Sequence, residues 1–259
     1  MSNTQVTLIQ IDNYGPWTVT PEPRREADLQ TLQSRLYADL AQLFGDREGY
    51  TFFARFDNMI AVSNGIDMAG HARIQESIRN RYPVTLSLSV ATGETPATAL
   101  STASAQLQAA GSAQDARRQE ILKGSPLSAS DRRDDDVQIA HFDVNDATGK
   151  YTDELDAFAT FIRIEQSYLE LMRYLHDEHE SLAFFVGGDN MIAVGADLDH
   201  DDYTRAVQHV DEVADVDLKV GVGAGETAQS AGMAAKHALE TCRRNGTTVE
   251  GPIPVPQSD

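Results

Sequence analysis

Along the first third of the chain, apolar residues recur in two patterns, one typical of strands and one typical of helices. These patterns predict alternating strands and helices. The segment Val6–Ile11, VTLIQI, alternates along much of its length and is rich in β-branched residues, which is typical of a half-buried strand. Leucines then recur at helical spacing and predict an amphipathic helix. They are Leu29, Leu32, Leu36, Leu40 and Leu43.

The next segments extend this pattern to a complete small domain. The stretch YTFFARFDNMIAVSN predicts two strands that meet at Asp57-Asn58, a dipeptide suited to a tight hairpin. A second helix over HARIQESIRNRY and a fourth strand over VTLSLSVATG follow. A third helix over TPATALSTASAQLQAAG completes the pattern.

The whole pattern is then repeated. The six residues Asp57–Val62, DNMIAV, recur as Asp189–Val194, 132 positions later, and the tripeptide GET recurs with the same offset. The segment LIQIDN resembles IAHFDV, which aligns Asp12 with Asp143 at an offset of 131. Three matches at nearly one spacing indicate a duplicated domain.

This organisation predicts an α+β protein made of two tandem ferredoxin-like domains. Each copy has the order βαββαβ, which gives an antiparallel sheet with helices on one face. The predicted domains span residues 1–122 and 137–251. Between them, residues 123–136 are polar and rich in Ser and Asp, which is typical of a linker. Residues 252–259 are proline-rich and are expected to form a flexible tail.

The net charge of the chain limits the classes of molecule that it is expected to bind. The chain of 259 residues has 40 acidic and 21 basic residues, a net charge of −19, and only four lysines. Such a chain repels nucleic acid and anionic membranes, so neither is an expected partner. An acidic surface poor in lysine also suggests adaptation to high salt, where repulsion between like charges is screened.

The lack of long apolar runs and the single cysteine indicate the cellular compartment and the kinds of metal site that the chain can form. No apolar run is long enough to span a membrane, and the N-terminus does not resemble a secretory signal. The single cysteine, Cys242, excludes an intrachain disulfide and a cysteine-based zinc cluster. We therefore expect a cytoplasmic protein.

Four aspartates are the predicted catalytic and metal-binding residues. In a βαββαβ domain, the end of the first strand lies beside the hairpin of the second and third strands. This brings Asp12 near Asp57 in the first copy and Asp143 near Asp189 in the second. Paired carboxylates with a main-chain carbonyl form an oxygen site suited to Mg²⁺. The alternative is that Asp-Asn serves only as a turn.

Further residues are predicted to bind substrate. Arginines before a helix N-terminus suit phosphate, glycines before a hairpin allow phosphate to approach the main chain, and Gln-Asp could bind the polar edge of a ligand. Ion pairing and turn roles remain open for each. The candidates are Asn13, Arg24, Arg25, Asn58, Gln114, Asp115, Gly187, Gly188 and Asn190.

Several of these segments carry a resemblance to a known family. An aspartate at the first strand and GGDN at the hairpin resemble the palm domain of nucleotide cyclases. More specifically, IQIDNYGPWTVTPEPRRE, RFDN, RIQESIRNRYP, GSAQD and FFVGGDN resemble the archaeal GTP cyclohydrolase III family over nearly the whole chain. The acidic composition suggests a member from a halophilic archaeon. The hairpin reads GGDN and not GGDEF, which argues against synthesis of cyclic dinucleotides.

The resemblance implies a Mg²⁺-dependent hydrolysis of GTP that feeds flavin and deazaflavin biosynthesis. It opens the imidazole ring and gives 2-amino-5-formylamino-6-ribosylamino-4(3H)-pyrimidinone 5′-phosphate and two inorganic phosphates. K⁺ is the implied activator. Two alternatives remain, a palm-fold nucleotidyl cyclase acting on GTP and a sensor that binds GTP without turnover. A homo-oligomer is expected, and the sequence leaves open which half holds the reacting purine.

Overall fold

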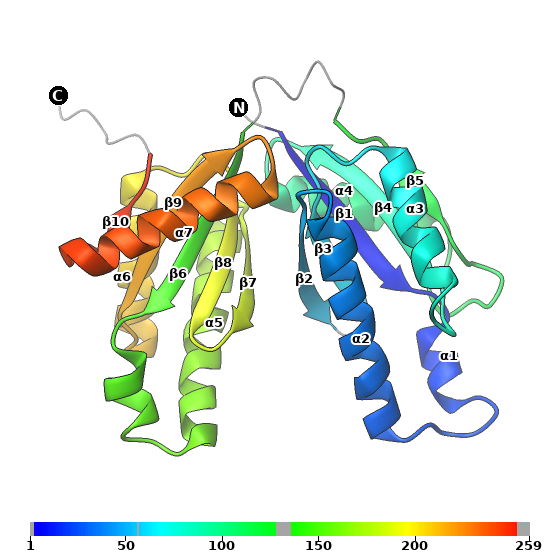
Figure 1. Cartoon of the computed structure of the whole chain (residues 1–259), viewed down its shortest axis with the longest axis horizontal. Helices are drawn as coiled ribbons and strands as arrows, with labels where there is room; N and C mark the ends of the chain where they lie inside the picture. The colour runs from blue at the N-terminus through cyan, green and yellow to red at the C-terminus, as the bar shows by residue number, and fades with distance from the viewer. Residues whose placement is uncertain (1–2, 56, 128–135, 253–259) are drawn as a thin grey trace.

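The protein folds into two similar halves, each built on one sheet (Figure 1). The computed structural model describes residues 3–55, 57–127 and 136–252. The N-terminal half contains β1 (Thr4–Ile11), α1 (Tyr14–Val19), α2 (Glu26–Gly45), β2 (Tyr50–Arg55), β3 (Asn58–Val62), α3 (Met68–Arg79), β4 (Leu86–Gly93), α4 (Pro96–Ala109) and β5 (Leu122–Gly124). The C-terminal half contains β6 (Val137–Val144), a π-helical turn (Thr148–Thr152), α5 (Ala157–His179), β7 (Leu182–Gly187), β8 (Asn190–Gly195), α6 (His200–Ala214), β9 (Leu218–Gly225), α7 (Ala228–Asn245) and β10 (Val249–Glu250).

The two sheets have the same topology, as the duplication predicts. Their strand orders are β2-β3-β1-β4-β5 and β7-β8-β6-β9-β10. The first four strands of each order pair antiparallel, and the short last strand adds in parallel at the edge. The βαββαβ unit is therefore confirmed in both halves, with one extra edge strand that the sequence pattern did not predict.

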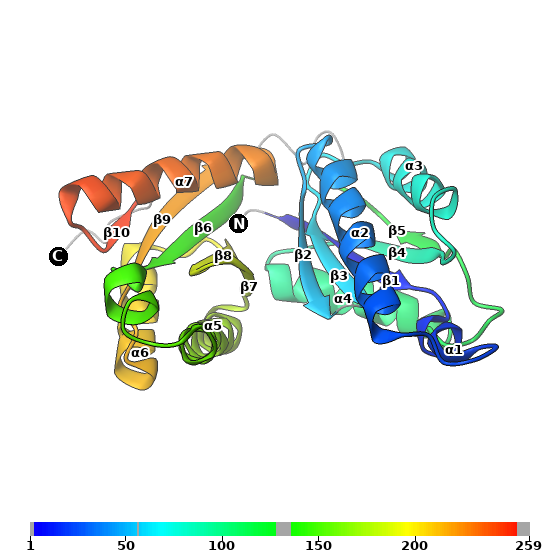
Figure 2. The ribbon, with the colours of Figure 1, turned by 60° about the horizontal axis from the view of Figure 1, so that its bottom comes forward.

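Helices cover both faces of each sheet. The two helices of the first βαββαβ unit, α2 and α3, bury residues such as Leu40 and Ile74 against Ile9 and Leu88. The additional helix α4 packs against β1 and β4 on the other face, where Val6 and Ala99 are buried. Figure 2 shows the second sheet between α7 on one side and α5 and α6 on the other. The prediction of helices on one face thus holds for the βαββαβ helices, and the third helix of each copy is the exception.

The repeated tripeptide GET has a structural explanation. It ends a strand and begins the helix α4 or α7, and its threonine caps that helix. Thr95 accepts a hydrogen bond from the main-chain nitrogen of Thr98, and Thr227 accepts one from that of Ser230, each within a capping box. Such caps each contribute about 1 kcal/mol. A side chain at Gly93 would lie 2.7 Å from the main-chain nitrogen of Ala99, so this position requires glycine.

The two halves meet through equivalent residues. The rings of Phe52 and Phe184 stack with centroids 4.3 Å apart and planes 2° apart. The main-chain nitrogen of Ala97 donates to the carbonyl of Glu180 at 3.1 Å, and a second bond at 3.0 Å links Gln229 to the carbonyl of Glu48. The two phenylalanines, the two donors Ala97 and Gln229, and the two acceptors Glu48 and Glu180 are each 132 positions apart, so the contact is nearly two-fold symmetric.

The strand register corrects one sequence alignment. Gln10 pairs with Asn58 across β1 and β3, and Asp143 pairs with the equivalent Asn190 across β6 and β8. Asp143 therefore corresponds to Gln10, at an offset of 133, and the predicted match with Asp12 is wrong. Asp12 corresponds instead to Asn145. The main-chain nitrogen of Asp12 donates to the carbonyl of Thr85, and that of Asn145 donates to the carbonyl of Asp217, 132 positions after Thr85. The sequence alignment matched Asp12 with Asp143 because both are aspartate. This match is two residues out of register, and it keeps Asp143 on the same face of the strand.

The ends of the predicted segments differ slightly from the structure. Lys123 and Gly124, assigned to the linker, belong to β5, and Leu127 is buried. Residues 128–135 of the linker and 253–259 of the tail lie outside the described residues. None of the described helices is both long and apolar enough to cross a membrane.

Candidate active site

The acidic pair of the C-terminal half is brought together at one end of its sheet. Asp143 lies near the end of β6 and is only 5% exposed, and Asp189 follows in the β7–β8 hairpin. Burial raises the pKa of Asp189, and the nearby carboxylate of Asp143 raises it further. The hairpin requires Gly187 and Gly188, because their φ angles are 115° and 66°. The predicted pairing of strand end and hairpin is confirmed in this half.

Cationic side chains surround Asp143. The Nζ of Lys219 lies 2.9 Å from its Oδ2, and a guanidinium nitrogen of Arg243 lies 2.8 Å from its Oδ1. Lys219 stands directly opposite Asp143 on β9, and Arg243 reaches it from α7. Neither residue was predicted from the sequence. The scarcity of lysine was the available signal, since two of the four lysines of the chain, Lys219 and Lys236, lie in this region.

An open cavity of about 360 Å³ adjoins this cluster. Its lining residues come from β6, the β7–β8 hairpin and α7, and they are His141, Val186, Gly187, Asn190, Lys236, Leu239, Glu240 and Arg243. A cavity with an arginine, a lysine and a glycine hairpin in its wall is suited to a polyanion such as a phosphate chain. The predicted substrate residues Gly187 and Asn190 both line it.

A chain of hydrogen bonds orients the acidic hairpin. His141 contacts the side-chain oxygen of Asn190 at 3.0 Å, and the Asn190 amide nitrogen donates to Asp189 at 3.0 Å. Burial lowers the pKa of His141, so the imidazole is neutral and its Nε2–H is the donor to Asn190. Asn190 is thereby fixed with its amide directed at Asp189.

The available carboxylate ligands suit Mg²⁺ better than a metal whose ligands must all come from the protein. The described residues contain no cluster of three or more His, Cys, Asp or Glu side chains able to hold an ion. Mg²⁺ commonly binds through one or two carboxylates and completes its shell with water and substrate phosphates. Asp143 and Asp189 supply two carboxylates beside a cavity suited to phosphate, so these residues fit the ion.

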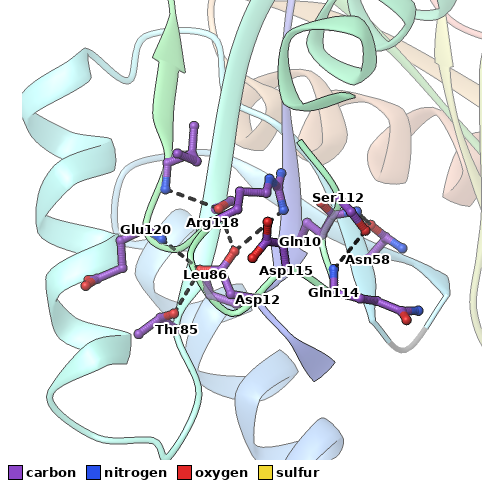
Figure 3. A network of polar contacts seen from close by, with 12 residues as sticks. Gln10, Asp12, Asn58, Thr85, Leu86, Ser112, Gln114, Asp115, Arg118 and Glu120 are labelled. Atoms are coloured by element: carbon purple, nitrogen blue, oxygen red, sulfur yellow. Dashed lines mark hydrogen bonds and ion pairs between the residues drawn. The ribbon is translucent and has the colours of Figure 1, made fainter. Parts of the chain in front are cut away.

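The N-terminal pair is arranged differently, and Figure 3 shows the surroundings of its first member, Asp12. The buried carboxylate of Asp12 accepts hydrogen bonds from the Thr85 and Ser87 hydroxyls at 2.8 and 2.6 Å and from the Glu120 main-chain nitrogen at 2.9 Å. Asp57 is more exposed and pairs with Arg55 at 2.9 Å. The main-chain carbonyl of Asp57 does accept from the nitrogen of Ile11, so strand end and hairpin are adjacent. The two carboxylates nevertheless bind separate protein groups.

The remaining N-terminal candidates lie around the end of β1. Asn13 has a left-handed main chain with φ 50°, and its nitrogen donates to the Ala113 carbonyl at 2.6 Å. Asn58 accepts from Gln10 at 3.0 Å, and the Gln114 side chain lies against Gly15. Hydrogen bonds from the main chain and side chain of Arg117 lower the pKa of Asp115, so this carboxyl is ionised and already paired.

Arg24 and Arg25 lie outside both clusters. The guanidinium carbon of Arg24 is 3.9 Å from the centre of the Trp17 ring, an arrangement typical of a cation–π contact. Arg25 forms a two-pronged ion pair with Asp28 in the first turn of α2. Both arginines stand on the loop between α1 and α2 and contact local residues.

Comparisons with known proteins place the chain in one family. A sequence family described as GTP cyclohydrolase III matches residues 6–258. The GTP cyclohydrolase III of Natronomonas pharaonis is 68% identical over 250 residues, which cover 96% of this chain and 99% of that protein. The one of Methanocaldococcus jannaschii is 48% identical over 239 residues, covering 92% and 88%.

Solved structures with a similar arrangement are distant. A bacterial light-regulated adenylyl cyclase matches with a TM-score of 0.40 and 10% identity, over 96% of this chain and 84% of that one. The GGDEF domain of DgcB from Caulobacter crescentus matches with a TM-score of 0.39 and 15% identity, over 45% of this chain and 77% of that one.

Proposed function

Because the chain belongs to the GTP cyclohydrolase III family, whose members are enzymes, we propose that it binds the triphosphate of GTP in its C-terminal half. The observation that carries this assignment is the acidic pair Asp143 and Asp189 beside Lys219 and Arg243. In the N-terminal half, by contrast, Asp12 is enclosed by hydrogen bonds from the protein. The family match leaves the nucleotidyl cyclase and the non-catalytic sensor without support.

The proposed reaction opens the imidazole ring of guanine. One water molecule adds to C8, and the bond between C8 and N9 breaks. The carbon stays on N7 as a formamide, and N9 takes a proton and keeps the ribose. Two further water molecules cleave the outer phosphates as inorganic phosphate, which leaves 2-amino-5-formylamino-6-ribosylamino-4(3H)-pyrimidinone 5′-phosphate. The resemblance to the family supports this product.

Asp143 and Asp189 are the proposed Mg²⁺ ligands. When bound, the ion would polarise phosphoryl oxygens and lower the pKa of a bound water. The protein's own part is to position both carboxylates. The Asn190 amide donates to Asp189, while Lys219 and Arg243 form ion pairs with Asp143.

The cations have a second proposed role toward the phosphates. Arg243 presents a planar guanidinium that suits two phosphate oxygens at once, whereas Lys219 and Lys236 offer compact charges. They replace the water that a triphosphate loses on entering the cavity. Gly187 and Gly188 lack side chains, so the hairpin main chain can approach the phosphates closely.

Other parts of the proposal rest on the family resemblance. K⁺ is the proposed activator, and the enzyme is proposed to act in the cytoplasm as a homo-oligomer. A K⁺ titration of turnover and the molar mass in solution test these points.

The main experiment compares aspartate variants of the two halves in the hydrolysis of GTP. Asp143→Asn and Asp189→Asn should remove most turnover, and Asp57→Asn should retain it. Ring opening is followed by loss of the guanine absorbance together with release of inorganic phosphate. An intact purine spectrum with release of pyrophosphate would instead show a cyclase.

A further inference from the structure

Large apolar side chains are exposed along one face of α5. They are Phe158, Phe161, Ile162 and Leu169, with exposed fractions of 69, 51, 52 and 44%. The last three follow Phe158 by three, four and eleven residues, so all four lie along one side of the helix, and we call them the α5 stripe. Figure 1 shows the first turns of α5 extending beyond the strands of their sheet. In a chain with a net charge of −19, a contiguous exposed apolar surface indicates an interaction site.

The equivalent helix of the N-terminal half, α2, lacks such a stripe. The Tyr37 hydroxyl donates to the carbonyl of Thr51, and the Tyr168 hydroxyl donates to that of Ala183. These bonds align the two helices at an offset of 131 residues. The α2 residues equivalent to the α5 stripe are Ala27, Gln30, Thr31 and Ala38. Since these residues are small or polar, the fold does not require an apolar stripe at this position.

A cavity of about 340 Å³ adjoins the other end of α5, between the two halves. Two of its lining residues, Met172 and His176, follow Phe158 by 14 and 18 residues, so they continue the α5 stripe. Phe53 and Phe184 add aromatic walls from β2 and β7. An apolar cavity of about 150 Å³ is large enough to bind benzene, so this one has room for a phenylalanine ring.

One arrangement of two chains brings the exposed rings and the cavity together. When two copies of α5 pack antiparallel about a two-fold axis at Leu169, residues at equal distances before and after Leu169 face each other. Phe161 precedes Leu169 by eight residues, and Asp177, which lines the cavity, follows it by eight. Phe161 of one copy then lies at the level of the cavity of the other copy, and the same contact forms twice. Helices that cross at about 20° stay in contact over several turns, as this arrangement requires.

Charged residues along the same face fit this arrangement. Glu165 stands four residues before Leu169, and Arg173 stands four residues after it. Neither side chain forms an ion pair within the described parts of the chain. In the antiparallel pair, Glu165 of each copy faces Arg173 of the other, whereas a parallel pair places like charges together. The charges therefore favour the antiparallel register.

We propose that the α5 stripe is the contact between two copies of this chain, in which Phe161 of each copy fills the cavity of the other. The occupant is a second copy because the exposed rings and the cavity lie on one helix and complement each other about a two-fold axis. The proposal rests on the homo-oligomer of the proposed function and specifies its contact, and it is independent of the proposed reaction. An oligomer built on this two-fold contact has an even number of chains.

The first test is a cross-link between two copies of position 169. Leu169→Cys places two thiols at the two-fold axis, and a short bis-maleimide reagent should join them into a covalent dimer of the full chain at high KCl. The native Cys242 is 1% exposed and is shielded from the reagent. Ala38→Cys is the matched control, because it puts a thiol at the equivalent exposed position of α2 and should give no covalent dimer.

The second test measures the molar mass in solution by sedimentation equilibrium. Phe161→Asp should weaken the contact at least about 100-fold and lower the molar mass by half or more, because it removes two buried rings from each pair of chains. Gln30→Asp, the equivalent change on α2, should leave the molar mass unchanged. Arg173→Glu should weaken the contact about tenfold at the lowest KCl concentration that keeps the chain folded, where screening is weakest. Adding Glu165→Arg to that variant should restore it.

Several results would overturn the proposal. They are an odd number of chains, a covalent dimer with Ala38→Cys but not with Leu169→Cys, and a molar mass that Phe161→Asp leaves unchanged. A monomeric wild type would contradict the homo-oligomer as well, whereas an oligomer that resists Phe161→Asp would contradict only this contact. The turnover of GTP by the aspartate variants is measured separately and tests only the proposed reaction site.

Discussion

The ammonium of Lys219 lies 2.9 Å from the Oδ2 of Asp143 and 2.8 Å from the side-chain oxygen of Asn145, where it joins the end of β6 to β9. The equivalent residue in the N-terminal half is Ser87, whose hydroxyl donates to Asp12 at 2.6 Å. One duplicated position therefore carries a cation in the half with the acidic pair and a neutral group in the other.

This relationship predicts the effect of Lys219→Met. The variant keeps the aliphatic stem but removes the charge, so GTP should bind more weakly, by about tenfold or more, because a phosphate loses a charged partner. The KM for GTP reports the effect. Lys150→Met is the control, since Lys150 lies on the exposed turn after β6 and pairs with Asp217 at 3.8 Å. Equal KM values in the two variants would exclude a phosphate role for Lys219.

The contact between Phe52 and Phe184 predicts that the halves stabilise each other. Either phenylalanine replaced by alanine should lower the free energy of unfolding by about 3–5 kcal/mol, because each ring is buried. The double variant should lose less than the sum of the two, by about 0.5–1.5 kcal/mol for the stacked pair. Chemical denaturation of the three variants measures this coupling. Strict additivity would mean that the stack contributes no energy of its own.

His71 predicts a pH dependence of stability. Its Nδ1–H donates to the Asp67 carbonyl at 2.8 Å, its Nε2 accepts from the Thr7 hydroxyl at 2.8 Å, and burial lowers its pKa. The unfolded chain binds this proton near pH ~6.5 and the folded chain only at lower pH. Stability is thus full above the ordinary pKa and falls as the pH decreases from that value toward the lowered one.

Variants separate this residue from the other histidines. His71→Asn should flatten the dependence of the unfolding free energy on pH below about 6.5. His176→Asn should leave that dependence unchanged, since His176 is 58% exposed. If the slope is the same in the wild type and in His71→Asn, the ring is not held neutral.

The sequence predicted those features that repeat or alternate. The strands, the hairpin at Asp189 and the duplication follow from local patterns, so they were confirmed. The short parallel strands β5 and β10 were not predicted, because two or three residues carry no period. Helix α1 was also missed, since it lies in a segment that contains Gly15 and Pro16.

The site was predicted only in part, for physical reasons. The pair Asp143 and Asp189 follows from chain order, because strand ends and hairpins lie together in this fold. Arg118 and Arg243 reach Asp12 and Asp143 from distant segments, and local sequence does not encode such contacts. The match of Asp12 with Asp143 failed since register depends on pairing across the sheet, which residue identity alone does not determine.

The measurement that tests the central claim most directly is the turnover of GTP by Asp189→Asn beside that by Asp57→Asn, its equivalent in the other half. If the C-terminal half holds the metal and the triphosphate, Asp189→Asn lowers kcat by about 100-fold or more, because several kcal/mol of charge stabilisation is lost. Asp57→Asn then stays within about threefold of the wild type, a change of less than 1 kcal/mol. A large loss in Asp57→Asn with normal turnover in Asp189→Asn would contradict the assignment.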